Sequence, residues 1–534
     1  MAQKLQVLQY VRPDFDVFRL DYIDAVQKFK KAESVNIAQM TIQNLDNLND
    51  SLISTYEILQ TLATQHPADK TYIDELAIWD MQVPLLQDLA YRLANSLIKS
   101  KFRNQLAIAL PLAKFKLAEN QLKTYSTEID ALLLDEQILI NQYHKILSTA
   151  TINVNGHVLS LTSALQILFT LDIQTQTLIE TTVTNFLTLN QAKLITLFEK
   201  LTANRKQQAK ILNYSTYSEF NMARHNHIDY TINEVLTLCD TILNTIPIKL
   251  DQPDLPQTNA NFTSTNLQKN LKPFLDAIDP VTTRFYDYLV EHNSLHFTNN
   301  IYCDVPSLAT FIINKQLPEI TINTDCLPNQ VDALLNQFGR AFQAFSIRGL
   351  KSGNLIFSFT DTQTALAKGF EFISWPWLHL LIGNDAQTFQ KLMIKKNLQA
   401  LNYHANQIKF ANYLYQPSTP SLAELNNLWP NQLGQLPTWL LDETLITHPN
   451  TAVDDLLGIV IGMQFWQPTE EQGNADIVNK YIQFAKNSSH DSLLNLLNLC
   501  AIESPFDSAT LPSLLNTIND YAQHLVSTGL TVSD

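Results

Sequence analysis

The sequence predicts a mainly α-helical protein with a few short strands, and three features support this fold class. Apolar residues recur at intervals of three and four over residues 45–62, 132–146 and 192–201, which is the period of an amphipathic helix. Glycine is scarce, at 11 of 534 residues, and strand-like alternation is brief. With 45% hydrophobic residues the chain can bury an extensive core, and at this length we expect two or more lobes.

The strand candidates cluster around one central helix. They are residues 309–313, 319–322 and 354–359, and they bracket the helix expected at residues 331–348. We therefore expect a small sheet beside that helix, at the edge of a cleft. Proline-containing stretches at residues 251–259, 416–420 and 430–437 predict breaks between helices, and no repeat of fixed period is present.

Composition excludes several classes of function. The chain has 36 Lys and Arg against 51 Asp and Glu, a net charge of -15, which opposes binding to nucleic acid. The glycines form neither a nucleotide-binding loop nor a nucleophile elbow. No apolar run is long enough to cross a bilayer, and the first residues do not resemble a signal peptide. With only 4 cysteines, we expect a cytoplasmic protein that does not bind membranes.

The most informative motif lies in the central helix. Residues 331–343 read V-D-A-L-L-N-Q-F-G-R-A-F-Q. A zinc-peptidase helix carries HExxH, in which two imidazoles one turn apart hold the metal and the Glu deprotonates the bound water. Here these three positions are Asn336, Gln337 and Arg340.

The flanking residues resemble those of one peptidase family. In the oligoendopeptidase F branch of the thimet-oligopeptidase-like zinc metallopeptidases, this helix typically reads V-D-V-L-x-H-E-x-G-H-A-F-Q and continues to a Ser-Arg pair. The chain keeps most of that frame, including Ser346 and Arg348. Four further segments resemble the family in the same order: residues 10–15, 217–230, 371–377 and 464–466.

This resemblance implies a two-lobed thimet-oligopeptidase-like, or zincin, architecture with a small β-sheet at the edge of the cleft. We expect an N-terminal helical lobe at residues 1–195 and a catalytic-like lobe with a degenerate zinc site at residues 196–534. In the family, short peptides enter the channel between two such lobes.

The resemblance also assigns positions to the family's other site residues. The third zinc ligand falls on Thr364, and the His and Tyr residues that hold the oxyanion fall on Thr444, Thr451, Ala452 and Asp455. A hydroxyl is a poor zinc ligand, and a guanidinium stays protonated and cannot bind a metal. We therefore expect no zinc, no other cofactor and no catalytic residue, since the general-base position is Gln337.

Other metal sites receive little support from the sequence. His292 and His296 have the i, i+4 spacing of a helical pair but lack a Glu between them, and we interpret them as a solvated helix end. His225 and His227 alternate within a polar stretch and are interpreted in the same way. The cysteines, Cys239, Cys303, Cys326 and Cys500, lie too far apart for a CxxC zinc motif.

A peptide-binding channel is expected to survive the loss of catalytic groups. Strand addition uses main-chain atoms, so the strand near residues 309–313 can still pair with an extended peptide. The candidate binding residues are Arg340, Tyr302, Phe311, Ile313 and Asn314.

Arg340 leaves two alternatives. A buried, unpaired guanidinium is costly, so it either pairs internally, with Glu371 or Asp361, or faces the channel and grips the carboxylate of a peptide.

The sequence therefore predicts a catalytically inactive oligoendopeptidase F-like protein that binds short peptides or a protein segment. One alternative is an oligoendopeptidase with residual or unconventional peptide hydrolysis. Another is a drifting paralogue without a selected role.

Overall fold

The computed structural model describes residues 8–154, 156–167, 173–246, 264–298, 307–323, 330–349, 359–418, 420–429, 436–449, 451–466 and 471–528. Helices dominate these residues, as the sequence predicted. Of the strand predicted at residues 354–359, residues 354–358 lie outside the described part of the chain, as does the predicted break at residues 251–259, while Phe359 is the N-cap of a helix. Within that part, none of the helices combines the length and the apolar character needed to cross a membrane.

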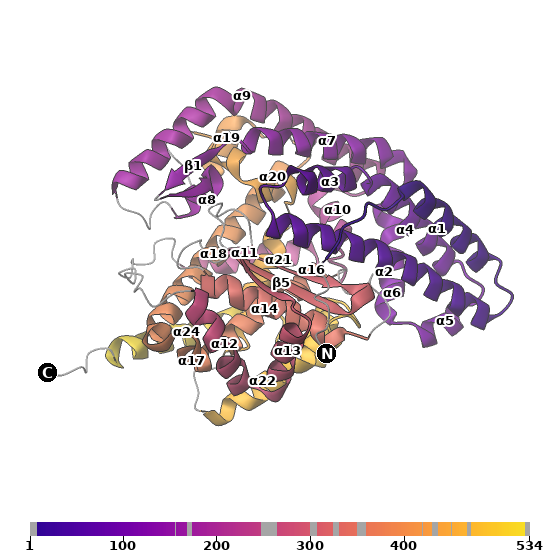
Figure 1. Cartoon of the computed structure of the whole chain (residues 1–534). Coiled ribbons are helices and arrows are strands. Elements are labelled where there is room, and N and C mark those ends of the chain that lie inside the picture. Colours follow the sequence, from indigo (N-terminus) through magenta and orange to yellow (C-terminus); the bar gives the residue numbers. More distant parts are fainter. Residues whose placement is uncertain are drawn as a thin grey trace.

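The N-terminal third forms a helical layer along one flank of the molecule, drawn in indigo and purple (Figure 1). Side-chain caps start several of its helices, because Asp14, Ser34 and Asp69 each accept hydrogen bonds from backbone N–H groups of the first turn. The helices of this layer are α1 (Phe15–Lys30), α2 (Val35–Gln65), α3 (Lys70–Asp80), α4 (Val83–Ile98), α5 (Arg103–Ala109), α6 (Leu112–Thr124) and α7 (Asp130–Leu147).

A hairpin that the sequence did not predict follows this layer. Strands β1 (Thr151–Val154) and β2 (His157–Ser160) pair in antiparallel fashion, with Gly156 in the turn at φ 90°. Helix α8 (Leu161–Ile167) and the long helix α9 (Ile173–Ile211) come next. The predicted lobe boundary at residue 195 falls inside α9, and the core beneath α9 contains residues from both sides of that boundary.

The central sheet lies between this layer and the C-terminal helices (Figure 1). Its order is β3 (Leu295–Thr298), β5 (Leu317–Asn323), β4 (Leu308–Ile312), so among the described strands β4 lies at the edge and pairs only with β5. Strands β4 and β5 match two of the three predicted strands. The helices that lead to the sheet are α10 (Tyr217–Arg224), α11 (Ile232–Thr245), α12 (Ser264–Ile278) and α13 (Pro280–Glu291).

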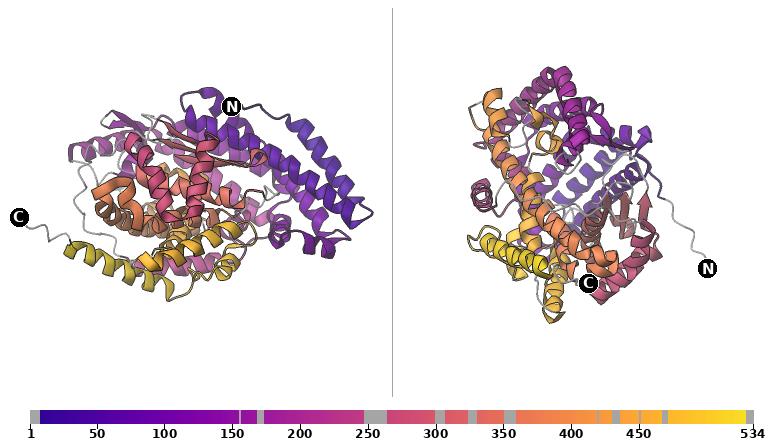
Figure 2. Two further views of the ribbon diagram at one scale, coloured as in Figure 1. Left: turned by 60° about the horizontal axis from the view of Figure 1, so that its bottom comes forward. Right: turned by 90° about the vertical axis from the view of Figure 1, so that its left-hand side faces the viewer.

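Most of the remaining helices form the other flank, drawn from pink to yellow (Figure 2), whereas residues 422–428 and 443–447 pack beside α9 (Figure 1). The remaining helices are α14 (Gln330–Ile347), α16 (Thr360–Ile373), α17 (Leu378–Ile382), α18 (Ala386–Leu414), α19 (Leu422–Leu428), α20 (Glu443–Thr447), α21 (Thr451–Met463), α22 (Glu471–Asn487), α23 (Leu493–Leu499) and α24 (Thr510–Thr528).

Three of these helices, α14, α16 and α21, form the centre of the largest core. A Cβ built on Gly339 of α14 would lie 2.7 Å from Cα of Ala367 on α16. A Cβ on Gly458 of α21 would lie 2.6 Å from Cγ2 of Thr364, and one on Gly462 would lie 2.7 Å from Cβ of Lys368. These glycines therefore let the three helices approach one another at backbone distance.

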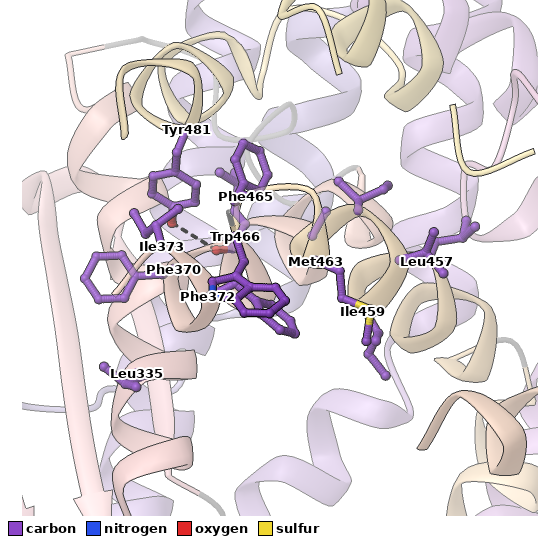
Figure 3. Packing of buried hydrophobic residues seen from close by; sticks show 14 of the residues in the cluster. Leu335, Phe370, Phe372, Ile373, Leu457, Ile459, Met463, Phe465, Trp466 and Tyr481 are labelled. Atoms are coloured by element: carbon purple, nitrogen blue, oxygen red, sulfur yellow. Dashed lines mark hydrogen bonds between the residues drawn. The ribbon is translucent and has the colours of Figure 1, made fainter. Parts of the chain in front are cut away.

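Aromatic rings close the same core on the side of α22. Figure 3 shows Phe370, Phe465 and Tyr481 packed together, and Tyr481 meets the ring of Phe465 edge to face at a centroid distance of 5.3 Å. The hydroxyl of Tyr481 donates to the carbonyl oxygen of Leu366 at 2.9 Å. Its polar end is thus satisfied inside an apolar environment.

A buried ion-pair network joins the N-terminal layer to the rest of the molecule. Arg205, only 1% exposed, donates to Glu136 at 2.7 Å and to the carbonyl oxygens of Ile446 and Thr447. Arg224 donates to the other oxygen of Glu136 at 2.9 Å. Removing one member would leave an uncompensated buried charge.

We predict that Gly339→Ala destabilises the protein by about 1 to 3 kcal/mol, because the added methyl group meets backbone of α16 that cannot move aside cheaply. Chemical denaturation measures the change. Ser346→Ala on the same helix is the control, since it removes a buried hydroxyl that has no hydrogen-bond partner and should be neutral or stabilising. A stable Gly339→Ala variant would mean that the helices can separate without loss.

Candidate functional site

The three HExxH-like positions lie on one face of α14. Asn336 and Arg340 are four residues apart, one helical turn, and Gln337 lies beside Asn336. All three are half-buried, whereas their neighbours Leu335 and Phe338 are buried in the core. The apolar residues of α14 thus fix its rotation and hold the three polar side chains on the remaining face.

Gln337 contacts the sheet. Its Oε1 accepts a hydrogen bond of 2.8 Å from the backbone N–H of Ala309 in β4. Its amide nitrogen is 3.4 Å from Oδ1 of Asn336, and Nε of Arg340 is 3.5 Å from the same oxygen. The carbonyl of Gln337 therefore points at strand β4.

Thr364, at the position of the third zinc ligand, lies on α16 and is buried. Its methyl group faces Gly458 of α21, where an added Cβ would approach it within 2.6 Å. This side of Thr364 is thus part of the close helix contact. A longer side chain that turned this way would meet α21.

These residues do not fit a zinc ion. The four positions offer two amides, a hydroxyl and a guanidinium, and none is a good zinc ligand. Among the described residues, no group of three or more His, Cys, Asp and Glu is placed to hold a metal.

Arg340 has no ion pair with a carboxylate of the described residues. Burial lowers the pKa of its guanidinium, while the negative charges of Asp455 and Asp454 on α21 act in the opposite direction. A guanidinium remains protonated in proteins, so this half-buried side chain carries a positive charge, which these two acids of α21 favour.

The internal partners expected for Arg340 bind other groups. Glu371 pairs with Lys368 at 2.9 Å and accepts from Asn397 at 3.1 Å. Asp361 accepts a 2.9 Å hydrogen bond from the hydroxyl of Tyr230. The expected internal pairing of Arg340 with Glu371 or Asp361 is therefore not found among the described residues.

A buried acid and histidine cluster lies behind the site and was missed by the sequence interpretation. Nε2 of His227 is 2.8 Å from Oδ1 of Asp454, and its ring stacks on Tyr230 at a centroid distance of 5.4 Å. Burial raises the pKa of Asp361 to about 6, and Asp454 adds to that shift although His227 opposes it. Burial lowers the pKa of His227, but Asp454 and the other nearby acids outweigh this effect and raise it overall.

The expectations for His227 and His296 are consequently wrong, whereas His292 is an exposed helix end as predicted. His227 is buried and paired with Asp454, so it does not belong to a solvated polar stretch. His296 lies in strand β3 and contacts Glu319 at 3.0 Å, whereas His292 is the C-cap of α13. The only sequence signal for the buried cluster was the Asp229-Tyr230 pair in the family-like segment.

The other candidate binding residues are placed in three different ways. Phe311 and Ile313 are 1% and 2% exposed and pack with Ala344 and Ile347 of α14, so only their main-chain atoms could reach a peptide. Asn314 is exposed. Tyr302 and the neighbouring Cys303 lie outside the described residues.

Comparison with known proteins assigns the fold. Residues 5–125 match the sequence family described as the peptidase M3 N-terminal domain. A structure of PZ peptidase A with an inhibitor is similar over 98% of this chain and 99% of that chain, with a TM-score of 0.85 and 21% identity. No curated protein sequence matches.

Two solved structures described as oligoendopeptidase F are also similar. One gives a TM-score of 0.85 at 21% identity and covers 98% of this chain and 99% of its own. The other, from Bacillus anthracis strain Ames, gives 0.83 at 21% identity and covers 98% of both chains. The mainly α-helical, thimet-oligopeptidase-like fold expected from the sequence is therefore confirmed.

We predict that Asp361→Asn stabilises the protein at pH 7. The folded-state pKa of about 6 lies above the unfolded value near 3.8, so ionisation of Asp361 costs stability as pH rises from about 4 to 6, by up to about 3 kcal/mol. Asn can still accept the hydrogen bond from Tyr230. We therefore expect the unfolding free energy to fall less steeply between pH 4 and pH 7 in the variant than in the parent protein. Chemical denaturation at several pH values measures this difference.

Asp24→Asn, on an exposed ion pair with Lys28, is the control and should change the unfolding free energy little at pH 7. The prediction fails if Asp361→Asn is less stable than the parent at pH 7 and its unfolding free energy depends on pH as steeply as that of the parent. This result would show that an ionised Asp361 stabilises the charged form of His227.

Proposed function

Starting from a chain that carries a peptidase M3 N-terminal domain and has the fold of oligoendopeptidase F, we propose a non-hydrolytic homologue that binds short peptides. One observation carries the proposal. The face of α14 that would hold zinc and the general base instead holds Asn336, Gln337 and Arg340, with the carbonyl of Gln337 engaged by strand β4.

The missing chemistry supports the first half of the proposal. Peptide hydrolysis by a metal-bound water needs a cation that lowers the pKa of that water from about 15.7 to about 7, together with a base that accepts its proton. Gln337 cannot accept a proton, and Arg340 repels a cation from the place where the metal would lie. The aligned oxyanion-holding positions are also changed, to Thr444, Thr451, Ala452 and Asp455.

The charge of Arg340 supports the second half. A guanidinium that is half-buried and has no ion pair with the carboxylates that the structure describes can take a ligand's carboxylate in bidentate fashion, a strong and directional contact. The C-terminal carboxylate of a short peptide fits this requirement. The similar PZ peptidase A was solved with an inhibitor, which is consistent with ligand binding in this fold.

We predict that protein purified without chelators contains far less than one zinc per chain and does not cleave a mixed oligopeptide library. Metal analysis by mass spectrometry and peptide fingerprinting measure the two properties. Stoichiometric zinc together with cleavage that a chelator abolishes would contradict the proposal and favour an oligoendopeptidase with residual activity.

The quadruple variant Asn336→His, Gln337→Glu, Arg340→His and Thr364→Glu restores the family's zinc ligands and general base. We expect it to bind zinc weakly, because the side chain at position 364 must avoid Gly458. Little cleavage should return, since each oxyanion donor is typically worth about 10² to 10³ in rate. Rapid cleavage by this variant would show that the rest of the site is still catalytically competent.

We predict that Arg340→Met leaves the melting temperature nearly unchanged but weakens peptide binding by about 10- to 100-fold, because a charged hydrogen bond contributes roughly 1.5 to 3 kcal/mol. Calorimetric titration compares peptides with a free and an amidated C-terminus. The amidated peptide should bind the parent protein and the variant equally.

Arg348→Met is the matched control, since Arg348 follows the same helix and is exposed. It should leave peptide affinity unchanged. Unaltered stability and unaltered binding in Arg340→Met would indicate a tolerated substitution and favour the drifting paralogue.

A further inference from the structure

The edge of strand β4 presents two backbone N–H groups away from the sheet. Ala309 lies opposite Ile320 of β5, whose own N–H donates to Ser294 at 2.8 Å on the other side. Ala309 and Ile320 are therefore a pair without mutual hydrogen bonds, and in an antiparallel ladder the N–H groups of Ala309 and Phe311 both point outward. An extended peptide adding to this edge would need these two donors.

One of these donors is occupied by a side chain of the chain itself, and the other faces a carboxyl group. The N–H of Ala309 donates to Oε1 of Gln337 at 2.8 Å. The N–H of Phe311 faces the carboxyl group of Glu57 on α2 and favours the charged form of that group. Burial nevertheless raises the pKa of Glu57 to about 8.

Helix α2 places a polar stripe along the same edge. Ser54, Glu57, Thr61 and Gln65 recur at intervals of three and four and so share one face of α2. Oγ of Ser54 accepts from the N–H of Asn314 at 3.0 Å, and the hydroxyls of Thr61 and Thr310 are 2.7 Å apart. Nε2 of Gln65 donates to Thr321 at 3.2 Å. Figure 1 shows α2 running beside the sheet.

Apolar contact contributes little to this seam. The small cluster of Phe311 and Ile313 is completed mainly by α14, and α2 adds only the partly buried Ile53. Hydrogen bonds between side chains and an edge strand can be exchanged for bonds to water at small net cost. Glu57 would also regain water around a carboxyl group that burial disfavours in its charged form.

We infer that α2 and Gln337 are internal competitors for the β4 edge, so that a peptide adds to this strand only after α2 has moved away from it. This inference rests on the proposed function for the presence of a peptide ligand. It gives the former general-base position a new role, since Gln337 now masks a main-chain donor of the peptide-accepting strand.

Hydrogen exchange in the ligand-free protein tests the masking independently of any peptide. We expect the amides of Ala309 and Phe311 to exchange slowly, with at least tenfold faster exchange at Ala309 in Gln337→Ala and at Phe311 in Glu57→Ala. Glu57→Gln is the control, because its amide oxygen can still accept from Phe311. Exchange at the rate of an exposed strand at both amides of the parent protein would overturn the inference.

A reversible lock tests the competition. In Thr61→Cys with Thr310→Cys, the two sulfur atoms replace hydroxyls that are 2.7 Å apart, so oxidation should join α2 to β4. We expect the oxidised protein to bind free-carboxylate peptides at least tenfold more weakly than the reduced protein, and Thr61→Cys alone to be insensitive to oxidation. Peptide binding that survives the disulfide would overturn the competition while leaving the proposed function intact.

Three proteins should bind peptide: the parent, Glu57→Ala and the reduced double variant. If none of them does, the proposed function is overturned, and with it the competition. The exchange rates of Ala309 and Phe311 would then still report whether α2 masks the edge. The two failures are thus distinguishable.

Discussion

The close approach of α14, α16 and α21 is the constraint on which the site depends. Glycine at positions 339, 458 and 462 removes the side chains that would separate these helices. Their relative positions are consequently set by backbone contact, and the residues carried on them can change without moving the frame. The fold is shared with PZ peptidase A at a TM-score of 0.85, although only 21% of the residues are identical.

The charged residues on and around α14 determine which kind of ligand this site could bind. Two buried acids on the helices packed against α14 are already paired, since Asp454 contacts His227 and Glu371 contacts Lys368. Arg340 supplies positive charge on the same face without a direct partner among the described carboxylates. In the proposed function, this face binds an anionic group of a ligand in place of a metal cation, because a cation would be repelled by the guanidinium.

Much of the fold could be predicted from the sequence, since the helical period, the scarcity of glycine and the family-like segments each reflect local rules. The strands β4 and β5 were also predicted from the local sequence. The β1–β2 hairpin was not, because its strands have only four residues each, and His296 was assigned to a helix because its spacing from His292 is ambiguous. A run of four residues, or a spacing of four between two residues, fits a short strand as well as a short helix.

The site was predicted less completely than the fold. The frame around Asn336, Gln337 and Arg340 follows from the sequence, but the partners of these residues depend on contacts between distant segments. Gln337 meets Ala309, and Glu57 meets Phe311 across 254 positions, 311 minus 57, of sequence. The burial of Phe311 and Ile313 likewise depends on α2 and α14 together, which no local pattern reveals.

The central claim is that the protein binds peptides without hydrolysing them. The most direct measurement is equilibrium binding of a free-carboxylate peptide to protein dialysed against a chelator, followed by mass spectrometry of the peptide from the same sample. The account predicts saturable binding and recovery of intact peptide, both unchanged when zinc is added back. Cleaved peptide on addition of zinc, or no binding under either condition, would contradict it.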